Sequence, residues 1–267
     1  MNICVCIKQV PDTNEIKVDP VTHTLVRKGV PSIVNPFDTY AQEVGVRLKE
    51  KLGGKVVVIS MGPEQAKEAI KTCLSVGADA GYLISSRKFG GSDTLATSYI
   101  LSEAIKAVEE KEGLKFDLIL CGKQAVDGDT AQVGPQIAEH LGLPVISYAQ
   151  DIKVEGDKVI VQRQYDDRYH VVEAKMPCLI TALSELNKPR YMTPGGIFDA
   201  CKAEITTWGR ADLKDVDDSN LGLKGSPTKI AKASDKVRKG AGEKIVPDSP
   251  EDGAAYIVAK FKEKHII

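Results

Sequence analysis

One loop of the sequence combines residues that could hold an anion. Residues 121–136 read C-G-K-Q-A-V-D-G-D-T-A-Q-V-G-P-Q and join an apolar run to a segment with helical periodicity. Gly122 and Gly128 let the backbone turn tightly and approach a ligand, and free N–H groups at the following helix start, over residues 129–132, attract negative charge. The loop therefore predicts a phosphate site, with an ordinary capped turn as the alternative. It matches neither the Walker spacing nor G-x-G-x-x-G.

Two further loops open helices in a similar way. Residues 89–98 read F-G-G-S-D-T-L-A-T-S, and Thr94 and Thr97 lie three residues apart on one helical face, where hydroxyl groups can meet a polar ring or a diphosphate. Ser92 or Asp93 acting as a plain N-cap is the alternative. Residues 35–38 read N-P-F-D and could be a cap with a hydrophobic staple.

Self-contained catalytic machinery is missing from the sequence. The four histidines, at positions 23, 140, 170 and 265, have no ligand spacing, and no G-x-S-x-G or C-x-x-C motif occurs among the 267 residues. Most of the six cysteines stand in apolar runs, where thiols pack as small hydrophobes. The chain therefore resembles a protein that relies on a bound cofactor for its chemistry.

Composition excludes two classes of partner. The formal net charge is −1, so there is no global basic field for nucleic acid or for an anionic membrane. No stretch approaches the roughly 20 apolar residues of a membrane span, and the first residues are too short for a signal-peptide core. We expect a cytoplasmic protein.

The elements that must position these loops alternate along the first half of the chain. Apolar, β-branched runs at 3–7, 55–60, 80–84 and 117–121 predict buried strands. Helical periods with Pro and Gly stop signals cover 40–52, 63–76, 92–111 and 130–141. This alternation predicts an α/β fold with a mostly parallel sheet flanked by helices, and ligands at the carboxyl ends of the strands.

Other segments break the alternation. A hairpin excursion is expected over 12–35, with strands at 16–18 and 24–27, and extra short strands at 149–154, 158–165, 169–173 and 178–182, the first two joined by a turn at 155–157. Residues 209–247 are polar and predict an extended arm, which ends in a helix capped by Ser249. Residues 1–208 are thus the expected α/β domain, and 209–267 the arm and helix, which either fold back or clasp another subunit.

Several motifs resemble the β subunit of electron transfer flavoprotein. They are V-C-I-K-Q-V-P-D at 5–12, N-P-F-D at 35–38, S-M-G-P at 60–63, G-A-D at 77–79, L-N-K-P-R-Y-M at 186–192 and, above all, G-K-Q-A-V-D-G-D at 122–129. The resemblance extends over nearly the whole chain and includes the family's signature region at 161–181. It implies a Rossmann-like domain that pairs with a homologous α subunit carrying its own FAD.

The resemblance also implies the cofactor contacts. Carried over from the family, the contacts with an adenine nucleotide are Cys6, Asn35, Pro36, Phe37, Asp38, Met61, Gly122, Lys123, Gln124, Ala125, Val126, Asp127, Gly128, Asp129, Thr130, Ala131, Gln132 and Val133. Simpler members hold AMP in this pocket, whereas flavin-bifurcating members hold a second FAD. Gly128 and the segment at 90–97 resemble the bifurcating group, so FAD is favoured over AMP, with Thr94, Thr97, Asp129 and Thr130 among its contacts.

The mechanism implied by the resemblance is electron bifurcation within the complex. NADH reduces the β-subunit flavin, one electron goes to ferredoxin or flavodoxin, and the other passes through the α-subunit FAD to an acyl-CoA dehydrogenase. The expected docking residues for the dehydrogenase are Asn187, Pro189, Arg190, Tyr191, Met192 and Ile197. A different class, an ATP-pyrophosphatase-like enzyme, would need its Ser-Gly-Gly-x-Asp-Ser loop after the first strand, where residues 8–12 read K-Q-V-P-D.

Overall fold

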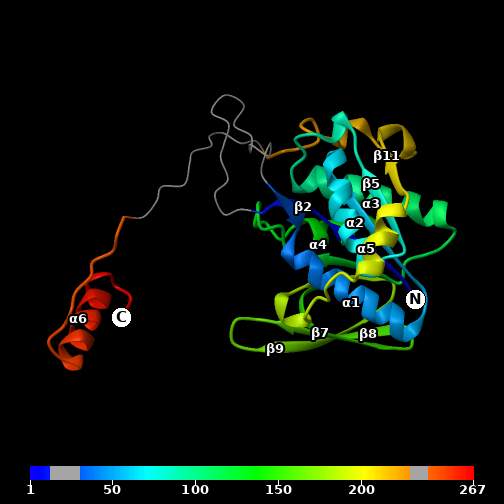
Figure 1. Ribbon diagram of the computed structural model, residues 1–267. Coiled ribbons are helices and arrows are strands. Elements are labelled where there is room, and N and C mark those ends of the chain that lie inside the picture. The colour runs from blue at the N-terminus through cyan, green and yellow to red at the C-terminus, as the bar shows by residue number, and fades with distance from the viewer. Residues whose placement is uncertain (13–30, 229–239) are drawn as a thin grey trace.

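A nine-stranded sheet organises the chain in the computed structural model, which describes residues 1–12, 31–228 and 240–267 (Figure 1). Its strands, in the spatial order β11-β5-β4-β1-β6-β10-β7-β8-β9, are β11 (Ile205–Trp208), β5 (Ala80–Ile84), β4 (Lys55–Met61), β1 (Asn2–Ile7), β6 (Leu118–Gly122), β10 (Cys178–Ala182), β7 (Val145–Glu155), β8 (Lys158–Gln164) and β9 (Tyr169–Lys175). Neighbours from β11 to β7 pair in parallel, and β8 and β9 extend the sheet antiparallel. The predicted mostly parallel α/β architecture is confirmed.

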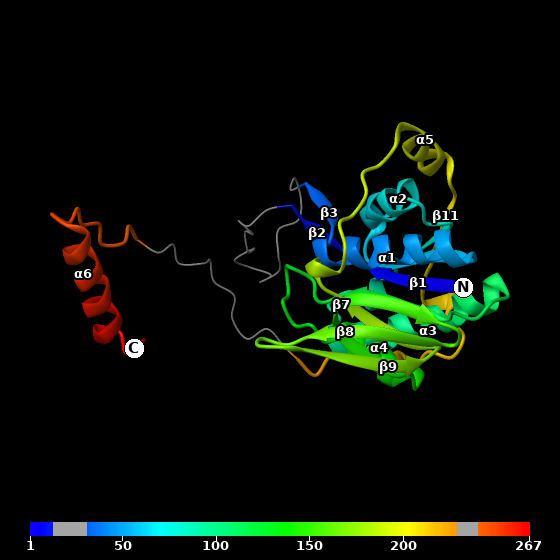
Figure 2. The same ribbon diagram turned by 90° about the horizontal axis from the view of Figure 1, so that it is seen from below.

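Helices cover both faces of the sheet. Four helices do so: α1 (Pro36–Leu52), α2 (Lys67–Ser75), α3 (Thr94–Glu112) and α4 (Val133–Leu141). The other two are α5 (Pro194–Lys202), which packs against α2, and α6 (Pro250–Glu263). Ile3, Val5 and Ile7 of β1 join one core with α1 and α2, whereas Cys4 and Cys6 join the other with α3 and α4. Both faces of β1 are therefore buried, which explains its uninterrupted apolar sequence. Figure 2 shows the two helix pairs on opposite sides of the sheet.

Several predicted boundaries shift for local reasons. The helix predicted over 130–141 begins at Val133, because Asp129 and Ala131 have left-handed φ angles of 50° and 54°. The helix predicted over 63–76 divides into a short 3₁₀ turn at Glu64–Ala66 and α2. The segment of the expected docking residues, 187–197, contains the start of α5, which Thr193 caps by accepting a hydrogen bond from the Gly196 N–H at 3.0 Å.

A second, two-stranded sheet follows β1. It pairs β2 (Gln9–Pro11) with β3 (Ser32–Val34) in antiparallel fashion. The predicted hairpin strands at 16–18 and 24–27 lie outside the described residues. The predicted turn at 155–157 is confirmed, since β7 and β8 pair antiparallel across it and Gly156 adopts a φ of 62°.

The first part of the C-terminal segment, residues 213–221, packs against the core of the α/β domain. Leu213, Val216 and Leu221 are buried in the same core as α3, although the surrounding sequence is polar. Further along, the predicted cap is confirmed, because the Ser249 hydroxyl oxygen accepts a hydrogen bond from the Asp252 N–H at 3.1 Å at the start of α6. No residue of α6 is buried, and both ribbon views show this helix apart from the sheet. Among the described residues, no helix is long and apolar enough to cross a lipid bilayer.

Candidate nucleotide-binding cleft

A cleft of about 410 Å³ lies at the carboxyl ends of the central strands. Residues that follow or end β1, β4 and β6 form its floor, and the N-terminal turns of α3 and α4 form its walls. Parallel strands present their carboxyl ends at one edge of the sheet, and helix N-termini there direct free N–H groups at a ligand. The cleft therefore has the position and the electrostatics of an anion or nucleotide site.

A buried polar network holds the floor of the cleft together. The Asp38 carboxylate accepts hydrogen bonds from the N–H groups of Lys8 at 2.7 Å and Gly122 at 3.1 Å, which fixes the start of α1 between the ends of β1 and β6. The Asn35 amide donates to Asp38 at 2.9 Å and to the Gln124 carbonyl at 2.8 Å. Burial raises the pKa of Asp38 to about 7, although these three N–H donors favour its charged form.

Gly122 sits where no side chain fits. A Cβ there would lie 2.3 Å from the Asp38 Oδ1 and 2.6 Å from the Phe37 carbonyl carbon, so the backbone of β6 and the start of α1 touch directly. Beyond it, two carboxylates tie the loop down: Asp129 accepts a hydrogen bond from the Gln124 side chain at 2.7 Å within the loop, and Asp127 forms an ion pair at 2.6 Å with Lys8, which follows β1. Both carboxylates therefore bond to side chains of this chain.

The second wall of the cleft is the start of α3. Asp93 caps this helix by accepting from the Ala96 N–H at 3.1 Å, and it also accepts from the Thr228 N–H at 3.0 Å. Partial burial works against its charge, but these donors outweigh it and hold the pKa of Asp93 below its usual value. The Thr94 hydroxyl donates to the Gln132 side-chain oxygen at 2.8 Å and so joins the two walls.

Comparison with known proteins assigns the chain to a family. The family model for the electron transfer flavoprotein domain matches residues 22–213. The electron transfer flavoprotein subunit beta of Clostridium acetobutylicum is 52% identical over the full length of both chains. This chain belongs to the electron transfer flavoprotein β-subunit family. The caffeyl-CoA reductase-Etf complex subunit CarD of Acetobacterium woodii is 50% identical, and the acryloyl-CoA reductase electron transfer subunit gamma of Anaerotignum propionicum is 43% identical, each over the full length of both chains.

The structure brings together most of the residues predicted to contact a nucleotide in this β-subunit homologue. Those that line the cleft are Cys6, Asn35, Asp38, Met61, Thr94, Thr97, Gly122, Lys123, Gln124, Ala125, Gly128, Thr130, Ala131, Gln132 and Val133. Those that do not line it are Pro36, Phe37, Val126, Asp127 and Asp129. Three of them support the cleft instead: Asp127 pairs with Lys8 after β1, Asp129 accepts from Gln124, and the Val126 N–H donates to the Asn35 side-chain oxygen at 3.1 Å.

Some lining residues were missed by the sequence reasoning. Lys8 and Gly62 follow β1 and β4 directly, so the rule that ligands bind at strand carboxyl ends could have included them. Gly134 also lines the cleft, and a Cβ there would lie 2.9 Å from the Thr181 Cγ2. Helical periodicity placed it inside a helix but not in contact with β10.

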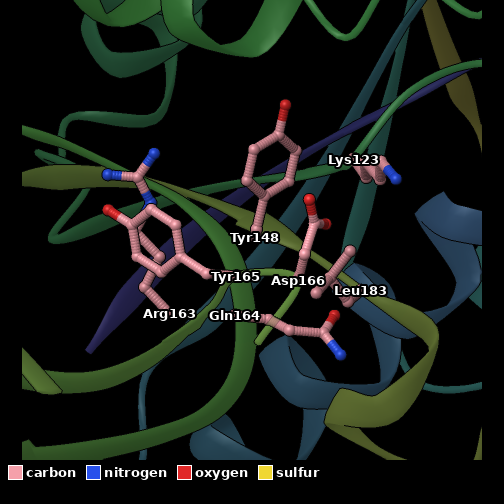
Figure 3. A pocket seen from close by; sticks show the side chains of 7 residues that line it. All are labelled: Lys123, Tyr148, Arg163, Gln164, Tyr165, Asp166 and Leu183. Carbon is pink, nitrogen blue, oxygen red and sulfur yellow. The ribbon is translucent and has the colours of Figure 1, made fainter. Parts of the chain in front are cut away.

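A second cavity, of about 510 Å³, shares Lys123 with the cleft (Figure 3). Its other walls come from β7, from the end of β8 and the turn after it, and from the residue following β10; they are Tyr148, Arg163, Gln164, Tyr165, Asp166 and Leu183. Four of these residues, Arg163, Gln164, Tyr165 and Asp166, lie in the signature region at 161–181.

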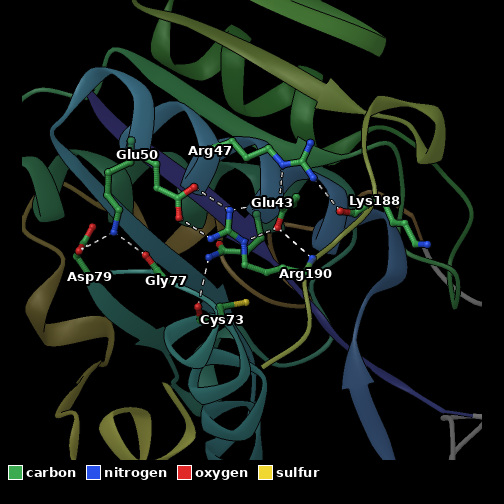
Figure 4. Close-up of polar contacts among 10 residues, drawn as sticks. Glu43, Arg47, Glu50, Cys73, Gly77, Asp79, Lys188 and Arg190 are labelled. Carbon is green, nitrogen blue, oxygen red and sulfur yellow. Dashed lines mark hydrogen bonds and ion pairs between the residues drawn. The ribbon is translucent and has the colours of Figure 1, made fainter. Parts of the chain in front are cut away.

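The expected docking segment has two parts. Residues 187–190, which we call the strap, are held against α1, and residues 191–198 carry exposed apolar side chains. Arg190 forks onto the carboxylates of Glu43 and Glu50 of α1, with its Nε 2.9 Å from Glu43 (Figure 4). The Asn187 amide donates to the Tyr40 carbonyl at 2.8 Å. Pro189 belongs to this strap. The side chains that are exposed are Tyr191, Met192, Ile197 and Phe198. Of the predicted docking residues, Tyr191, Met192 and Ile197 are therefore free for a partner, whereas Arg190 and Asn187 bond within the chain.

Proposed function

We propose that this chain is the β subunit of a heterodimeric, flavin-bifurcating electron transfer flavoprotein. In this proposal it binds FAD in the cleft and accepts electrons from NADH. One electron goes to ferredoxin or flavodoxin, and the other goes to the FAD of the α subunit, which serves an acyl-CoA dehydrogenase. The names of the caffeyl-CoA and acryloyl-CoA reductase relatives support this group, since both belong to electron transfer subunits of acyl-CoA reductases.

The observation that carries the proposal is that two helix-opening loops line one cleft. Residues 122–134 and residues 91–97 face it from α4 and α3, so phosphate-binding N–H groups and hydroxyl groups meet the same ligand. A site for a single monophosphate needs only one of these walls, whereas a dinucleotide can use both. A bound flavin would supply hydride and single-electron transfer.

The residues present fit such a group. Gly122 lets the backbone of β6 meet the start of α1 in the floor of the cleft, and Cys6 and Cys121, which are register partners on β1 and β6, also line the cleft. Thr94 and Thr97 present hydroxyl groups that can bond to the polar edge of a ring or to a diphosphate. The protein's part is to orient the group and to set its electrostatic surroundings.

The deciding experiment counts nucleotides. The chain is co-expressed with its α subunit, and the nucleotides released from the purified pair on denaturation are identified. We expect about two FAD and negligible AMP per heterodimer. About one FAD and one AMP would contradict bifurcation and indicate an ordinary single-flavin carrier with a structural AMP.

Variants in the wall of α3 test the placement of the flavin. Thr94→Trp and Thr97→Trp fill the cleft and are expected to lower the FAD content while the unfolding midpoint changes little. Thr207→Trp, on the exposed face of the edge strand β11, is the matched control. An unchanged FAD content in both cleft variants would contradict this placement.

We also propose that residues 209–267 hold the α subunit, with α6 as the clasp. Ile257, Val258 and Phe261 of α6 are about half exposed and form an apolar stripe, and none of residues 240–267 is buried in this chain. Ending the chain after Thr228 keeps the buried Leu213, Val216 and Leu221, so the core should unfold as before. The truncated chain should fail to co-purify with the α subunit; unaffected co-purification would contradict the clasp.

A further inference from the structure

The cavity beside the cleft contains an arginine to which the described residues give no hydrogen-bond acceptor. The Arg163 Nε is buried and has no hydrogen-bond acceptor, and in the described part of the chain its terminal nitrogens make no hydrogen bond or ion pair. Its guanidinium carbon lies 5.0 Å from the ring centroid of Tyr165 and 5.9 Å from that of Tyr148. A buried N–H without an acceptor is unfavourable, so this guanidinium is placed for a group that the described residues do not supply.

The backbone is distorted to aim Tyr148 at this cavity. Tyr148 has a φ of 60°, a conformation that side-chain-bearing residues rarely adopt, and its N–H donates to the Thr181 hydroxyl oxygen at 3.0 Å. The register between β7 and β10 shifts at the same place, between Ile146 and Ala149, as it does in a β-bulge. Strain and bulges of this kind are found where a side chain serves a site.

The charges in the cavity are not balanced at the arginine. Figure 3 shows the Tyr148 ring standing between the Arg163 guanidinium on one side and Lys123 and Asp166 on the other. Lys123 lies 5.5 Å from the Tyr148 ring centroid and makes no side-chain ion pair in the described residues. Asp166 is the one carboxylate among the lining side chains, and it lies on the lysine side. The arginine end therefore attracts a negative group.

We propose that this cavity is a carboxylate-binding site, in which Arg163 forks onto the carboxylate between the rings of Tyr148 and Tyr165. A planar guanidinium matches the two oxygens of a carboxylate. A carboxylate bound in the cavity would give the Arg163 Nε–H an acceptor. The carboxylate comes either from an Asp or Glu side chain of the α subunit or from a small free carboxylate. Tyr165, which lines the cavity and is exposed to solvent, fits a protein partner.

The first test uses the full chain alone and needs neither flavin nor partner, so it is independent of the proposed function. The Nε–Hε cross-peak of Arg163 is assigned by its loss in Arg163→Lys and followed by NMR during titration with acetate, with chloride at equal ionic strength as the control. The Arg190 Nε donates to Glu43 at 2.9 Å and marks the position of a carboxylate-bound guanidinium. We expect the Arg163 cross-peak to move saturably towards that position with acetate only.

The second test uses the heterodimer and separates the two sources. If an α-subunit side chain occupies the site, the Arg163 cross-peak is already shifted, acetate no longer moves it, and Arg163→Lys weakens the heterodimer by roughly 10-fold. The exposed Arg87→Lys is the control and should leave the affinity unchanged. If the site takes a small free carboxylate instead, acetate should still move the Arg163 cross-peak in the heterodimer as it does in the isolated chain. A cross-peak that moves neither with acetate nor on heterodimer formation overturns the proposal.

Discussion

Helix α1 carries two nearly buried carboxylates with opposite surroundings. Asp38, at its start, accepts hydrogen bonds from N–H groups only, and in the described residues no cation lies within ion-pair distance of it. Glu43 accepts from the guanidinium groups of Arg47 and Arg190. Burial raises the pKa of Asp38 to about 7, whereas at Glu43 the arginines outweigh burial and hold the pKa below its usual value.

The difference separates two ways of fixing a loop to a helix. At the cleft end, dipolar N–H groups position the carboxylate but do not neutralise it, so the contact responds to protonation near neutral pH. At the other end, the paired charges that hold the strap at Arg190 remain ionised across that range. The stability of the protein should therefore depend more on the contacts at the cleft end of α1 than on those at the strap, both when the pH changes and when a side chain there is enlarged.

The largest expected effect comes from adding one carbon at the cleft end. Gly122→Ala places a Cβ 2.3 Å from the Asp38 Oδ1 and 2.7 Å from its backbone nitrogen, so β6 and α1 must separate. We expect a loss of more than about 3 kcal/mol in the free energy of unfolding, measured with urea. Gly128→Ala, where a Cβ meets nothing within 4 Å, is the matched control and should change stability by less than about 1 kcal/mol. Equal effects would contradict the close contact.

The pH dependence of stability should differ between the two carboxylates. Between pH 4 and 7 the folded chain keeps a proton on Asp38 that the unfolded chain releases, because the folded pKa is about 7 and the usual value is 3.8. Asp38 thus lowers stability as pH rises through this window, by on the order of 3 kcal/mol between pH 5 and 8. The difference in the free energy of unfolding between wild type and Asp38→Asn should therefore become smaller from pH 5 to pH 8.

Glu43→Gln is the control for that experiment. The pKa of Glu43 lies below its usual value, so its carboxylate is ionised throughout pH 5 to 8 and its gap from wild type should stay constant. Urea unfolding at the two pH values measures both gaps. A constant gap for Asp38→Asn would show that its N–H donors already keep it charged.

Removing Arg190, which holds the strap on α1, should have an intermediate effect on the free energy of unfolding. Arg190→Ala removes the partner of both Glu43 and Glu50 and leaves the nearly buried Glu43 with Arg47 alone. We expect the free energy of unfolding to fall by about 2 kcal/mol. Arg190→Lys keeps the charge but not the fork and should recover only part of it. Tyr191→Ala, at a side chain 91% exposed, should be neutral. A neutral Arg190→Ala would mean that the strap is held by other contacts.

The elements that position the cleft were predictable because their signals are local. Apolar runs identified β1, β4, β5 and β6, and the rule about strand carboxyl ends brought the loop after Gly122 to the helix start at Thr94. Loop composition alone could not separate lining residues from supporting ones. Asp127 and Asp129 are polar residues in the same loop as Thr130, but Asp127 pairs with Lys8 and Asp129 accepts from Gln124.

The features that escaped prediction depend on contacts between distant segments. Arg190 was expected to meet a partner, yet its carboxylates lie 147 and 140 residues earlier, on α1. Leu213 and Leu221 carry no periodic pattern and are buried only because α3 lies beside them. The unpartnered Arg163 has no local signature either, since burial and the lack of an acceptor are properties of the folded sheet.

The smallest expected effect tests whether Glu43 depends on both of its arginines. Arg47 is an i,i+4 neighbour of Glu43 with its side chain 52% exposed, whereas the side chain of Arg190 is 33% exposed and forks onto two carboxylates. Arg47 is half exposed and Arg190 still neutralises Glu43 when Arg47 is removed, although Arg47 also donates to the Lys188 carbonyl at 3.0 Å. Arg47→Gln should therefore lower the free energy of unfolding by less than about 1 kcal/mol. A double-mutant cycle with Glu43→Gln gives the coupling directly, and the same cycle with Arg190→Ala should give a larger one. If the Arg47 coupling were the larger, the helix itself rather than the strap would hold Glu43, and the contrast between the two ends of α1 would have to be explained without Arg190.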